Sequence, residues 1–229
     1  MTLSDCLTRA TRIWPDRTAT TYLGRSRTWQ QVSEDVGNLP AGLRSLGVLP
    51  GDRVALLGEN SDRYLDSYFA AGWLGAAAVP LNTRLTRKEL GLCLGDSGAC
   101  ILLAGDSASV AAAALAGDVP GVRRVVHIGE SVAPPGIFYS GGTTGTPKGV
   151  VLSHDNLLAN AAHVLPAPRW SESTMFLLAA RKFHLAGICC LATVCVAAGR
   201  HVIVPRFDPE GVITAVHEHS GPLPAWYRR

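Results

Sequence analysis

Charged side chains are scarce in this sequence. Only 17% of its 229 residues are Asp, Glu, Lys or Arg, and the formal net charge is +3. A protein that binds nucleic acid needs a clustered basic face, so we expect no nucleic acid partner. Hydrophobic residues make up 47%, which excludes a disordered chain and is enough for one α/β domain or two small ones.

A long apolar run is also missing. The longest one, Leu185–Ala198, is shorter than a membrane-spanning helix, so it predicts a buried helix and no transmembrane segment. Asp5 and its polar neighbours interrupt the first turns, and we therefore expect no signal peptide at Met1. The hypothesis of a structural or membrane protein depends on this apolar run alone, and the sequence does not favour it.

The cysteines lack any metal-binding pattern. No CxxC pair or other metal-ligand spacing relates Cys6, Cys93, Cys100, Cys189, Cys190 and Cys195. Without an export signal, they are predicted to be buried, reduced thiols in a cytoplasmic protein.

Short apolar runs alternate with longer helical patterns from Asp52 onward. These runs show no alternation of polar and apolar residues, which indicates strands covered on both faces. The candidate strands are Arg53–Leu57, Ala77–Leu81, Ala99–Leu103, Arg124–Ile128, Gly136–Ser140, Thr174–Leu178 and His201–Val204. Because strand and helix alternate, we predict an α/β fold with a doubly wound, mostly parallel sheet.

Several helix starts can be read from capping residues. The pairs Thr28/Gln31 and Thr86/Glu89 are capping boxes, and Asp208 before Pro209 is an N-cap followed by a first-turn proline. After Thr86, one helix face carries Leu90, Cys93 and Leu94. One predicted helix contains a residue that disfavours helices. Pro40 lies within the helically spaced apolar residues from Trp29 to Leu46, and we expect a kink there.

The segment Ser140–Gly149, with the sequence SGGTTGTPKG, is predicted to be an exposed loop between two strands. Glycines allow backbone N–H groups to surround an anion, threonine hydroxyls add donors, and Lys148 adds a positive charge. The predicted phosphate-binding residues are Ser140, Gly141, Gly142, Thr143, Thr144, Gly145 and Lys148. A flexible surface turn is the alternative, but a turn does not require the lysine.

A Walker-type loop is excluded by spacing. That motif needs GxxxxGK[ST], with the lysine directly after a glycine. Here Thr146 and Pro147 separate Gly145 from Lys148, and Gly149 occupies the place of the hydroxyl residue.

This loop resembles the signature [ST]SGTTGxPKG of the adenylate-forming superfamily, with Gly141 in place of the usual serine. Further segments resemble the acid–CoA ligases (acyl-CoA synthetases) of that superfamily: TWQQ at Thr28–Gln31, GVLPGDRVALLGENS at Gly47–Ser61, LGAAAVPLNTRLTRKEL at Leu74–Leu90, DSGA at Asp96–Ala99, FHLAG at Phe183–Gly187 and RFDPE at Arg206–Glu210. The resemblance covers residues 1–219 as part of the AMP-binding N-terminal domain, and residues 220–229 form a tail that does not match.

The resemblance implies a reaction in two steps. A carboxylate, expected to belong to a fatty or aryl acid, attacks the α-phosphate of ATP to give an acyl-adenylate. CoA then displaces AMP to give a thioester. ATP, Mg²⁺ and CoA are thereby implied as cofactors. The loop would hold the β- and γ-phosphates as charge builds on the leaving pyrophosphate.

By the same resemblance, Phe183, His184 and Gly187 would border the acid pocket. A buried core histidine is the alternative reading of His184. Arg181 and Lys182 depart from the family pattern, which has a proline and an apolar residue there. No acidic residue lies between Met175 and Arg206 to meet an ammonium group, which argues against an amino acid substrate.

The remaining histidines give weaker signals. His217 and His219 could face a metal together, but a solvated helix end is the more common arrangement, and no metal site is predicted. His127 and His201 lie in apolar strand-like runs, where we expect core histidines.

The sequence after His219 resembles no part of the family. It contains neither the YGxTE segment that meets adenine nor the small domain with the catalytic lysine, so no catalytic residue is assigned. Two functions stay open: a ligase that works with a separately encoded C-terminal fragment, or a non-catalytic remnant that binds phosphate or nucleotide weakly. In either case we expect no activity from the chain alone.

Overall fold

The computed structural model describes residues 2–128, 137–140, 148–166, 170–179, 185–205 and 207–219. The helices are α1 (Leu3–Ile13), α2 (Trp29–Ser45), α3 (Asp62–Leu74), α4 (Arg87–Ser97), α5 (Ser109–Asp118), α6 (His154–Val164), α7 (Leu185–Ala197) and α8 (Pro209–His219), with a short 3₁₀ helix at Asp106–Ala108. The strands are β1 (Thr18–Tyr22), β2 (Arg25–Thr28), β3 (Arg53–Leu57), β4 (Ala77–Pro80), β5 (Ile101–Ala104), β6 (Arg124–His127), β7 (Ile137–Ser140), β8 (Lys148–Val151), β9 (Met175–Leu178) and β10 (Arg200–Ile203).

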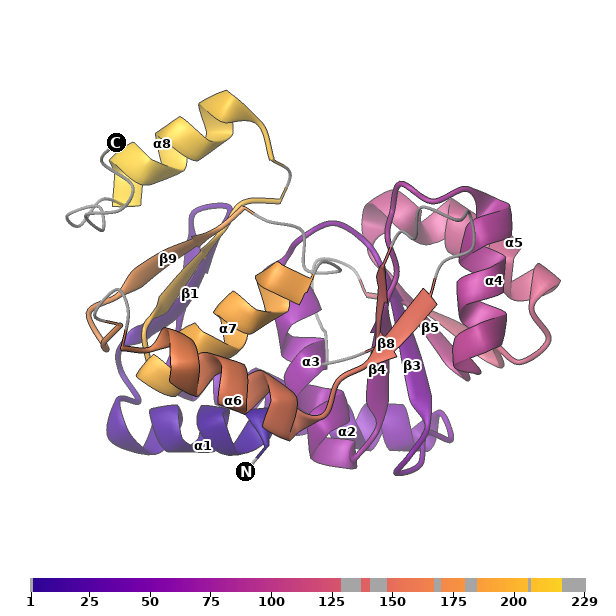
Figure 1. The fold of residues 1–229 in the computed structure, drawn as a ribbon, viewed down its shortest axis with the longest axis horizontal. Coiled ribbons are helices and arrows are strands. Elements are labelled where there is room, and N and C mark those ends of the chain that lie inside the picture. Colours follow the sequence, from indigo (N-terminus) through magenta and orange to yellow (C-terminus); the bar gives the residue numbers. More distant parts are fainter. Residues whose placement is uncertain are drawn as a thin grey trace.

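The strands form two main sheets and a hairpin (Figure 1). The first sheet has the order β2-β1-β10-β9, in which only the β1–β2 pair is antiparallel. The second sheet, β4-β3-β5-β6, is parallel throughout. The predicted α/β class with mostly parallel strands is confirmed, and the strands are divided between two sheets.

Helices cover both faces of the second sheet. Along β3, Val54 and Leu56 belong to a core shared with α1, α2, α3, α7 and the first sheet, whereas Ala55 and Leu57 belong to a separate core under α4 and α5. In Figure 1, α3 lies between the two sheets, and α4 and α5 lie on the far side of the second. This two-sided burial explains why β3 is apolar at every position after Arg53.

All the candidate strands form, with ends shifted by no more than two residues. β1 and β2 were not predicted, because TATTY and RSRT contain few apolar residues. α1 was also missed, although Leu3, Cys6, Leu7 and Ala10 have helical spacing and are buried.

The predicted helix starts are confirmed. Thr28 Oγ1 accepts from the N–H of Gln31, and the Gln31 side chain accepts in return from the N–H of Thr28. Thr86 and Glu89 repeat this arrangement. Asp208 Oδ1 accepts from the N–H of Gly211 at 2.7 Å, directly before α8. α2 continues through Pro40 as one helix, and the kink expected there stays a prediction.

The apolar run forms α7, a largely buried helix as predicted. Within the described part of the chain, no helix is long and apolar enough to cross a membrane. All six cysteines are free thiols; Cys6, Cys93 and Cys195 are buried, and Cys100, Cys189 and Cys190 are half-buried.

Candidate functional site

Two strands flank the predicted phosphate-binding loop. β7 and β8 pair antiparallel, and Ser140 lies opposite Lys148 where the pairing ends. Lys148 and Gly149, predicted as loop, are the first residues of β8. Gly141, Gly142, Thr143, Thr144 and Gly145 lie outside the described residues. The expected loop between two strands is therefore supported at both ends, and its role as a phosphate site stays a prediction.

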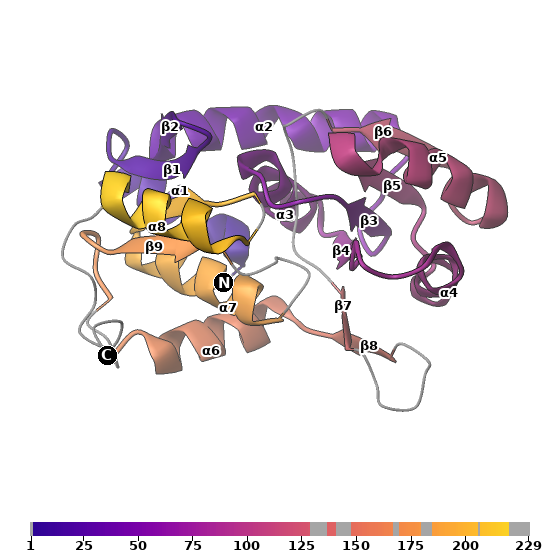
Figure 2. The ribbon, with the colours of Figure 1, turned by 90° about the horizontal axis from the view of Figure 1, so that it is seen from above.

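The hairpin lies beside the second sheet. β7 lies against β4, and β8 contacts α4. Figure 2 shows the hairpin at the margin of the molecule, next to β4. Its backbone thus anchors the predicted loop beside a sheet whose inner strands, β3 and β5, are largely buried on both faces.

Only part of the predicted acid pocket can be placed. Gly187 is buried in the first turn of α7. Phe183 and His184, together with the unusual Arg181 and Lys182, lie outside the described residues. Their part in a pocket stays a prediction.

A cavity of about 500 Å³ opens where strands of the second sheet end. Residues that follow β3, β4 and β5 line it, among them Glu59, Arg84 and Ser107. The order β4-β3-β5 shows that the chain goes from β3 to one neighbour and later returns to the other. Ligands of open α/β sheets bind at such a reversal, outside the carboxyl ends of the strands. None of the site residues predicted from the sequence is among the described residues that line this cavity.

Two glycines let β3 and β5 end close together. Gly58 follows β3 and Gly105 follows β5, and a Cβ on Gly58 would lie 3.3 Å from the Cα of Gly105. A side chain at Gly58 would therefore press on backbone that cannot move aside. A glycine directly after each of two apolar strands is the sequence signal that could have indicated this crevice.

The cavity offers one arginine for an anion. Arg87 is engaged, since its Nε and one terminal nitrogen lie 2.6 and 2.8 Å from the carboxylate oxygens of Asp118. Arg84 is exposed and forms no ion pair with any carboxylate that the structure describes. Its guanidinium can donate to a phosphate or carboxylate of a ligand, although Glu59 in the same lining would oppose a large negative charge.

The carboxyl ends of the two sheets are joined by a buried amide. Asn60 follows β3, and its Nδ2 donates to the backbone oxygen of Val204, which follows β10, at 3.4 Å. Asn60 is 5% exposed. This contact holds the carboxyl edges of both sheets toward each other.

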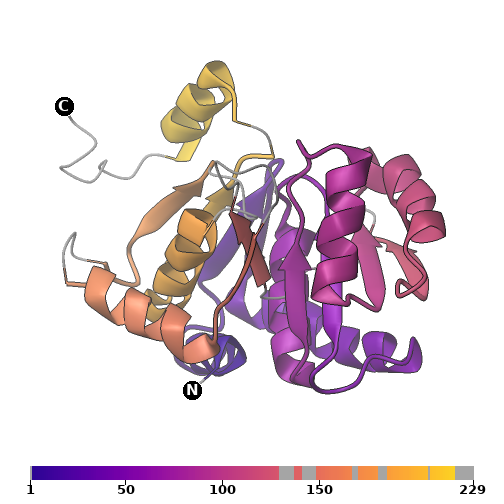
Figure 3. The ribbon, with the colours of Figure 1, turned by 45° about the vertical axis from the view of Figure 1, so that its right-hand side comes forward.

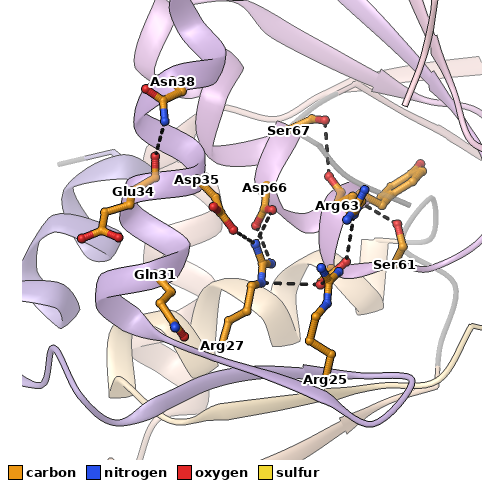
Figure 4. Close-up of polar contacts among 12 residues, drawn as sticks. Arg25, Arg27, Gln31, Glu34, Asp35, Asn38, Ser61, Arg63, Asp66 and Ser67 are labelled. Carbon is orange, nitrogen blue, oxygen red and sulfur yellow. Dashed lines mark hydrogen bonds and ion pairs between the residues drawn. The ribbon is translucent and has the colours of Figure 1, made fainter. Parts of the chain in front are cut away.

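A buried charge cluster lies between the first sheet and two helices (Figure 4). Arg27 on β2 donates to both carboxylate oxygens of Asp66 on α3, at 2.7 and 2.9 Å, and to Asp35 on α2, at 2.7 Å. Asp62 lies 3.5 Å from the Arg27 Nε and 2.7 Å from a terminal nitrogen of Arg25. The cluster fixes the β1–β2 hairpin against α2 and α3.

Burial sets the electrostatics of this cluster. The side chains of Asp62 and Asp66 are 1% and 3% exposed, and that of Arg27 is 9% exposed. Burial raises the pKa of Asp66 to about 6, and the nearby Arg27 limits that rise. The signal that could have revealed the cluster is the pair Asp62 and Asp66, one turn apart in a helix whose other residues are mostly apolar.

The histidines divide as follows. His201 is fully buried, as predicted, and its Nε2 lies 3.6 Å from the Cys195 sulfur. The expectation of a core histidine at His127 is wrong, because β6 is an edge strand and His127 at its end is exposed. His217 is exposed on α8, and the described residues contain no group of three or more His, Cys, Asp or Glu that could hold a metal.

The pattern of a known family matches nearly the whole chain. The family described as AMP-binding enzyme matches residues 7–221. The chain belongs to this family. Its members include the acid–CoA ligases that the Gly142–Gly149 signature resembles, so the predicted family is confirmed.

Named relatives are larger acid–CoA ligases. A feruloyl-CoA synthase from Amycolatopsis is 38% identical over 226 residues, which cover 92% of this chain and 45% of that protein. A long-chain-fatty-acid–CoA ligase from Thermus thermophilus is 31% identical over 212 residues, which cover 81% of this chain and 39% of that protein. The chain thus spans less than half the length of these curated relatives.

Solved structures of AMP-binding enzymes share the fold. The N-terminal domain of FACL13 from Mycobacterium tuberculosis superposes with a TM-score of 0.87 at 25% identity, covering 95% of this chain and 60% of that domain. ATP-bound MatB from Rhodopseudomonas palustris gives 0.81 at 26% identity, covering 96% of this chain and 48% of that protein.

Proposed function

We propose that this chain is the phosphate-binding part of an acid–CoA ligase. It would take part in the ATP-dependent activation of a carboxylic acid to an acyl-adenylate and then to a CoA thioester. The family match over residues 7–221 is the observation that carries this proposal. The signature loop, held between paired strands β7 and β8, supports it.

The chemistry proposed for this chain is electrostatic. Attack by the carboxylate on the α-phosphate expels pyrophosphate, so negative charge grows on the β- and γ-phosphates. Backbone N–H groups of Gly141–Gly145, the hydroxyls of Thr143 and Thr144, and Lys148 would stabilise that charge. The described residues contain no group of three or more His, Cys, Asp or Glu that could hold a resident Mg²⁺.

The cavity beside Arg84 supports a second ligand position. The reaction uses two phosphorylated molecules, ATP and CoA, and the predicted loop accounts for only one set of phosphates. The cavity lies at the carboxyl ends of β3, β4 and β5 and carries an arginine that pairs with no described carboxylate. We assign it to a phosphate-bearing ligand of the same reaction.

The acid is proposed to be a fatty or aryl acid. The absence of Asp and Glu between Met175 and Arg206 disfavours an amino acid, whose ammonium group would need a carboxylate. The feruloyl and long-chain-fatty-acid specificities of the named relatives are consistent with either class. The free thiols of all six cysteines fit work in a reducing compartment such as the cytoplasm.

The nucleoside site and the catalytic lysine would come from protein that corresponds to the rest of the larger relatives, since the chain spans 45% of the feruloyl-CoA synthase. The alternative function is a non-catalytic remnant with weak phosphate or nucleotide binding. ATP–pyrophosphate exchange separates the two functions. The assay uses ferulate, long-chain fatty acids and succinylbenzoate, with the chain alone and with the C-terminal remainder of the Amycolatopsis enzyme as a separate polypeptide. Acid-dependent exchange in the mixture supports the ligase, and its absence with every acid supports the remnant.

A further inference from the structure

One face of α4 is turned away from the rest of the molecule. The opposite face packs under the second sheet's outer core through Leu90, Cys93 and Leu94. On the outward face Leu92 is 51% exposed, and Figure 2 shows α4 at the margin of the molecule. A single exposed leucine is ordinary on a protein surface. What distinguishes this face is the set of residues around Leu92.

A groove of about 770 Å³ runs along this face of α4. Leu92 and Gly95 of α4 line it on one side, and Asp118 and Val119 at the end of α5 line it on the other. The middle of the groove is therefore apolar. Charged residues of α4 lie at both of its ends.

Two glycines leave the surface of α4 flat in this groove. A Cβ on Gly95 would meet no described atom within 4 Å, and a Cβ on Gly91 would lie 3.9 Å from Val119 Cγ2. Neither glycine has a positive φ. The packing and backbone of the chain therefore do not require glycine at either position, although glycine weakens a helix relative to alanine. Small side chains do allow the axis of a second helix to approach closely.

The charges on this face indicate which helix fits. Lys88 and Asp96 lie four positions before and after Leu92, and all three are exposed. Lys88 forms no ion pair with a carboxylate that the structure describes, and its neighbour Arg87 is paired with Asp118. A twofold axis through Leu92 would place Lys88 of each chain opposite Asp96 of the other. The outward face of α4 is thus complementary in charge to a second copy of itself.

We propose that the outward face of α4 is a dimer contact, at which two copies of the chain pack α4 antiparallel across a twofold axis at Leu92. The two Leu92 side chains meet beside the open space at Gly95, and a Lys88–Asp96 pair lies on each side of them. One helix from each chain buries less area than a standard interface, so we expect a weak dimer that dissociates on dilution.

Reversal of single charges tests this contact. Lys88→Glu brings two carboxylates together at both ends of the contact, and Asp96→Lys brings two ammonium groups together. Both substitutions agree with the helix dipole, so α4 should keep its stability. Each variant alone is expected to dimerise at least about tenfold more weakly than the unmodified chain, measured by sedimentation equilibrium. Arg44→Glu, at an exposed position in the last turn of α2, is the control and should leave the dimer unchanged.

Mixing the two variants gives a readout that a general loss of association cannot imitate. In a heterodimer of Lys88→Glu with Asp96→Lys, opposite charges meet again at both ends of the antiparallel pair. A 1:1 mixture should therefore dimerise although each variant alone does not. A mixture that stays monomeric, or a dimer that survives both single substitutions, would overturn the proposal.

Gly95→Leu tests the close approach of the helices independently of charge. The space beside Gly95 is open, so the substituted chain should melt no lower than the unmodified chain, followed by circular dichroism. The added side chain would occupy the place of the second helix and should abolish the dimer. A dimer of unchanged affinity in Gly95→Leu would overturn the proposal, as would an unmodified chain that stays monomeric up to about 0.5 mM.

Discussion

At the scale of single residues, Arg27 is the shared cation of the buried charge cluster. It contacts three carboxylates, and two of these, Asp62 and Asp66, are almost completely buried. Each of these charges would be costly to bury alone, because a low-dielectric interior replaces its hydration. The three groups therefore depend on one another, and removal of the shared cation affects both buried acids.

Replacement of Arg27 is expected to destabilise the protein strongly. Arg27→Leu keeps an apolar stem but leaves Asp66 without its bidentate partner, and breaking a buried pair in this way costs about 3–5 kcal/mol. Urea denaturation measures the loss. Arg25→Leu is the matched control on the same strand; its side chain is 48% exposed and Asp62 would retain Arg27, so a smaller loss is expected. A loss below about 1 kcal/mol for Arg27→Leu would contradict the role given to this cluster.

Asp66 is expected to make stability depend on pH in an unusual direction. Its pKa is raised from 3.8 to about 6, so between these values the folded protein binds a proton that the unfolded chain releases. That contribution to stability is present in acid and is lost as the pH rises through about 6. Asp66→Asn removes it. The wild type should therefore gain stability relative to Asp66→Asn between about pH 7 and about pH 5, measured by urea denaturation. A constant difference would show that the pKa of Asp66 is not raised.

No sequence motif indicated the residues of this cluster. Arg25 and Arg27 belong to a strand that was not recognised, and their buried partners on α3, Asp62 and Asp66, lie 35 to 39 positions away. A buried charge has no local pattern, since it becomes visible only when the elements that enclose it are placed. Predicted sites were limited to motifs such as Ser140–Gly149, in which the residues that cooperate are neighbours in the sequence.

At the scale of elements, α2 combines a good helix pattern with one poor residue. Thr28 and Gln31 cap its start, and Val32, Val36 and Leu43 are buried on one face. Pro40 lies inside the helix, lacks an N–H, and deprives the carbonyl of Val36 of its usual partner. The burial of the apolar face on both sides of Pro40 explains why the helix continues.

Pro40→Ala is expected to stabilise the protein. An interior proline costs a helix about 3 kcal/mol, and proline recovers about 1 kcal/mol by restricting the unfolded chain, so a net gain of about 2 kcal/mol is predicted. Chemical denaturation would measure it. An unchanged or lower stability would show that the packing of α2 against α3 requires a bend at Pro40, which a regular helix cannot supply.

Lys148 connects an element to the proposed chemistry. It is the first residue of β8, opposite Ser140. Lys148→Ala should weaken the binding of pyrophosphate or ATP by about 1–3 kcal/mol, the scale of a charge-assisted hydrogen bond, in a calorimetric titration. Lys88→Ala, a lysine exposed on α4, is the control for a general loss of positive charge. Equal effects of the two substitutions would mean that the anion binds elsewhere.

Most elements could be predicted because their signals are local. The apolar runs that became β3, β4, β5 and β10 needed no knowledge of their partners, and the capping pairs marked helix starts within a residue. β1 and β2 could not be predicted from apolar runs, because threonines and arginines make up most of their residues. Their stability comes from strand pairing and from the charge cluster around Arg27. Neither of these produces a periodic pattern of residues in the sequence.

At the scale of the whole molecule, the two sheets pack against a shared set of helices. Thr20 on β1 pairs with His201 on β10, so the first sheet joins the start of the chain to a strand formed almost at its end. No local pattern predicts such a pairing, and the sequence therefore indicated the fold class without the division into two sheets. Figure 3 shows α8 beyond the first sheet, apart from the shared core.

The last prediction concerns activity. Adenylation requires the α-phosphate, the carboxylate and the nucleoside to be held together, because alignment of the reactants supplies much of the rate. This sequence contains the groups proposed for the β- and γ-phosphates but no segment that resembles the family's adenine-binding YGxTE or its catalytic lysine. Loss of one such electrostatic contact costs about 100- to 1000-fold in rate, and several are lacking together.

We therefore expect no detectable acyl-CoA from these 229 residues alone, measured by mass spectrometry with ferulate or fatty acids, ATP and CoA. Thioester should form once the C-terminal remainder of the Amycolatopsis enzyme is added. ATP-dependent thioester synthesis without that fragment would contradict this, and would mean that residues 220–229 or a second copy of the chain rebuilds the nucleoside site.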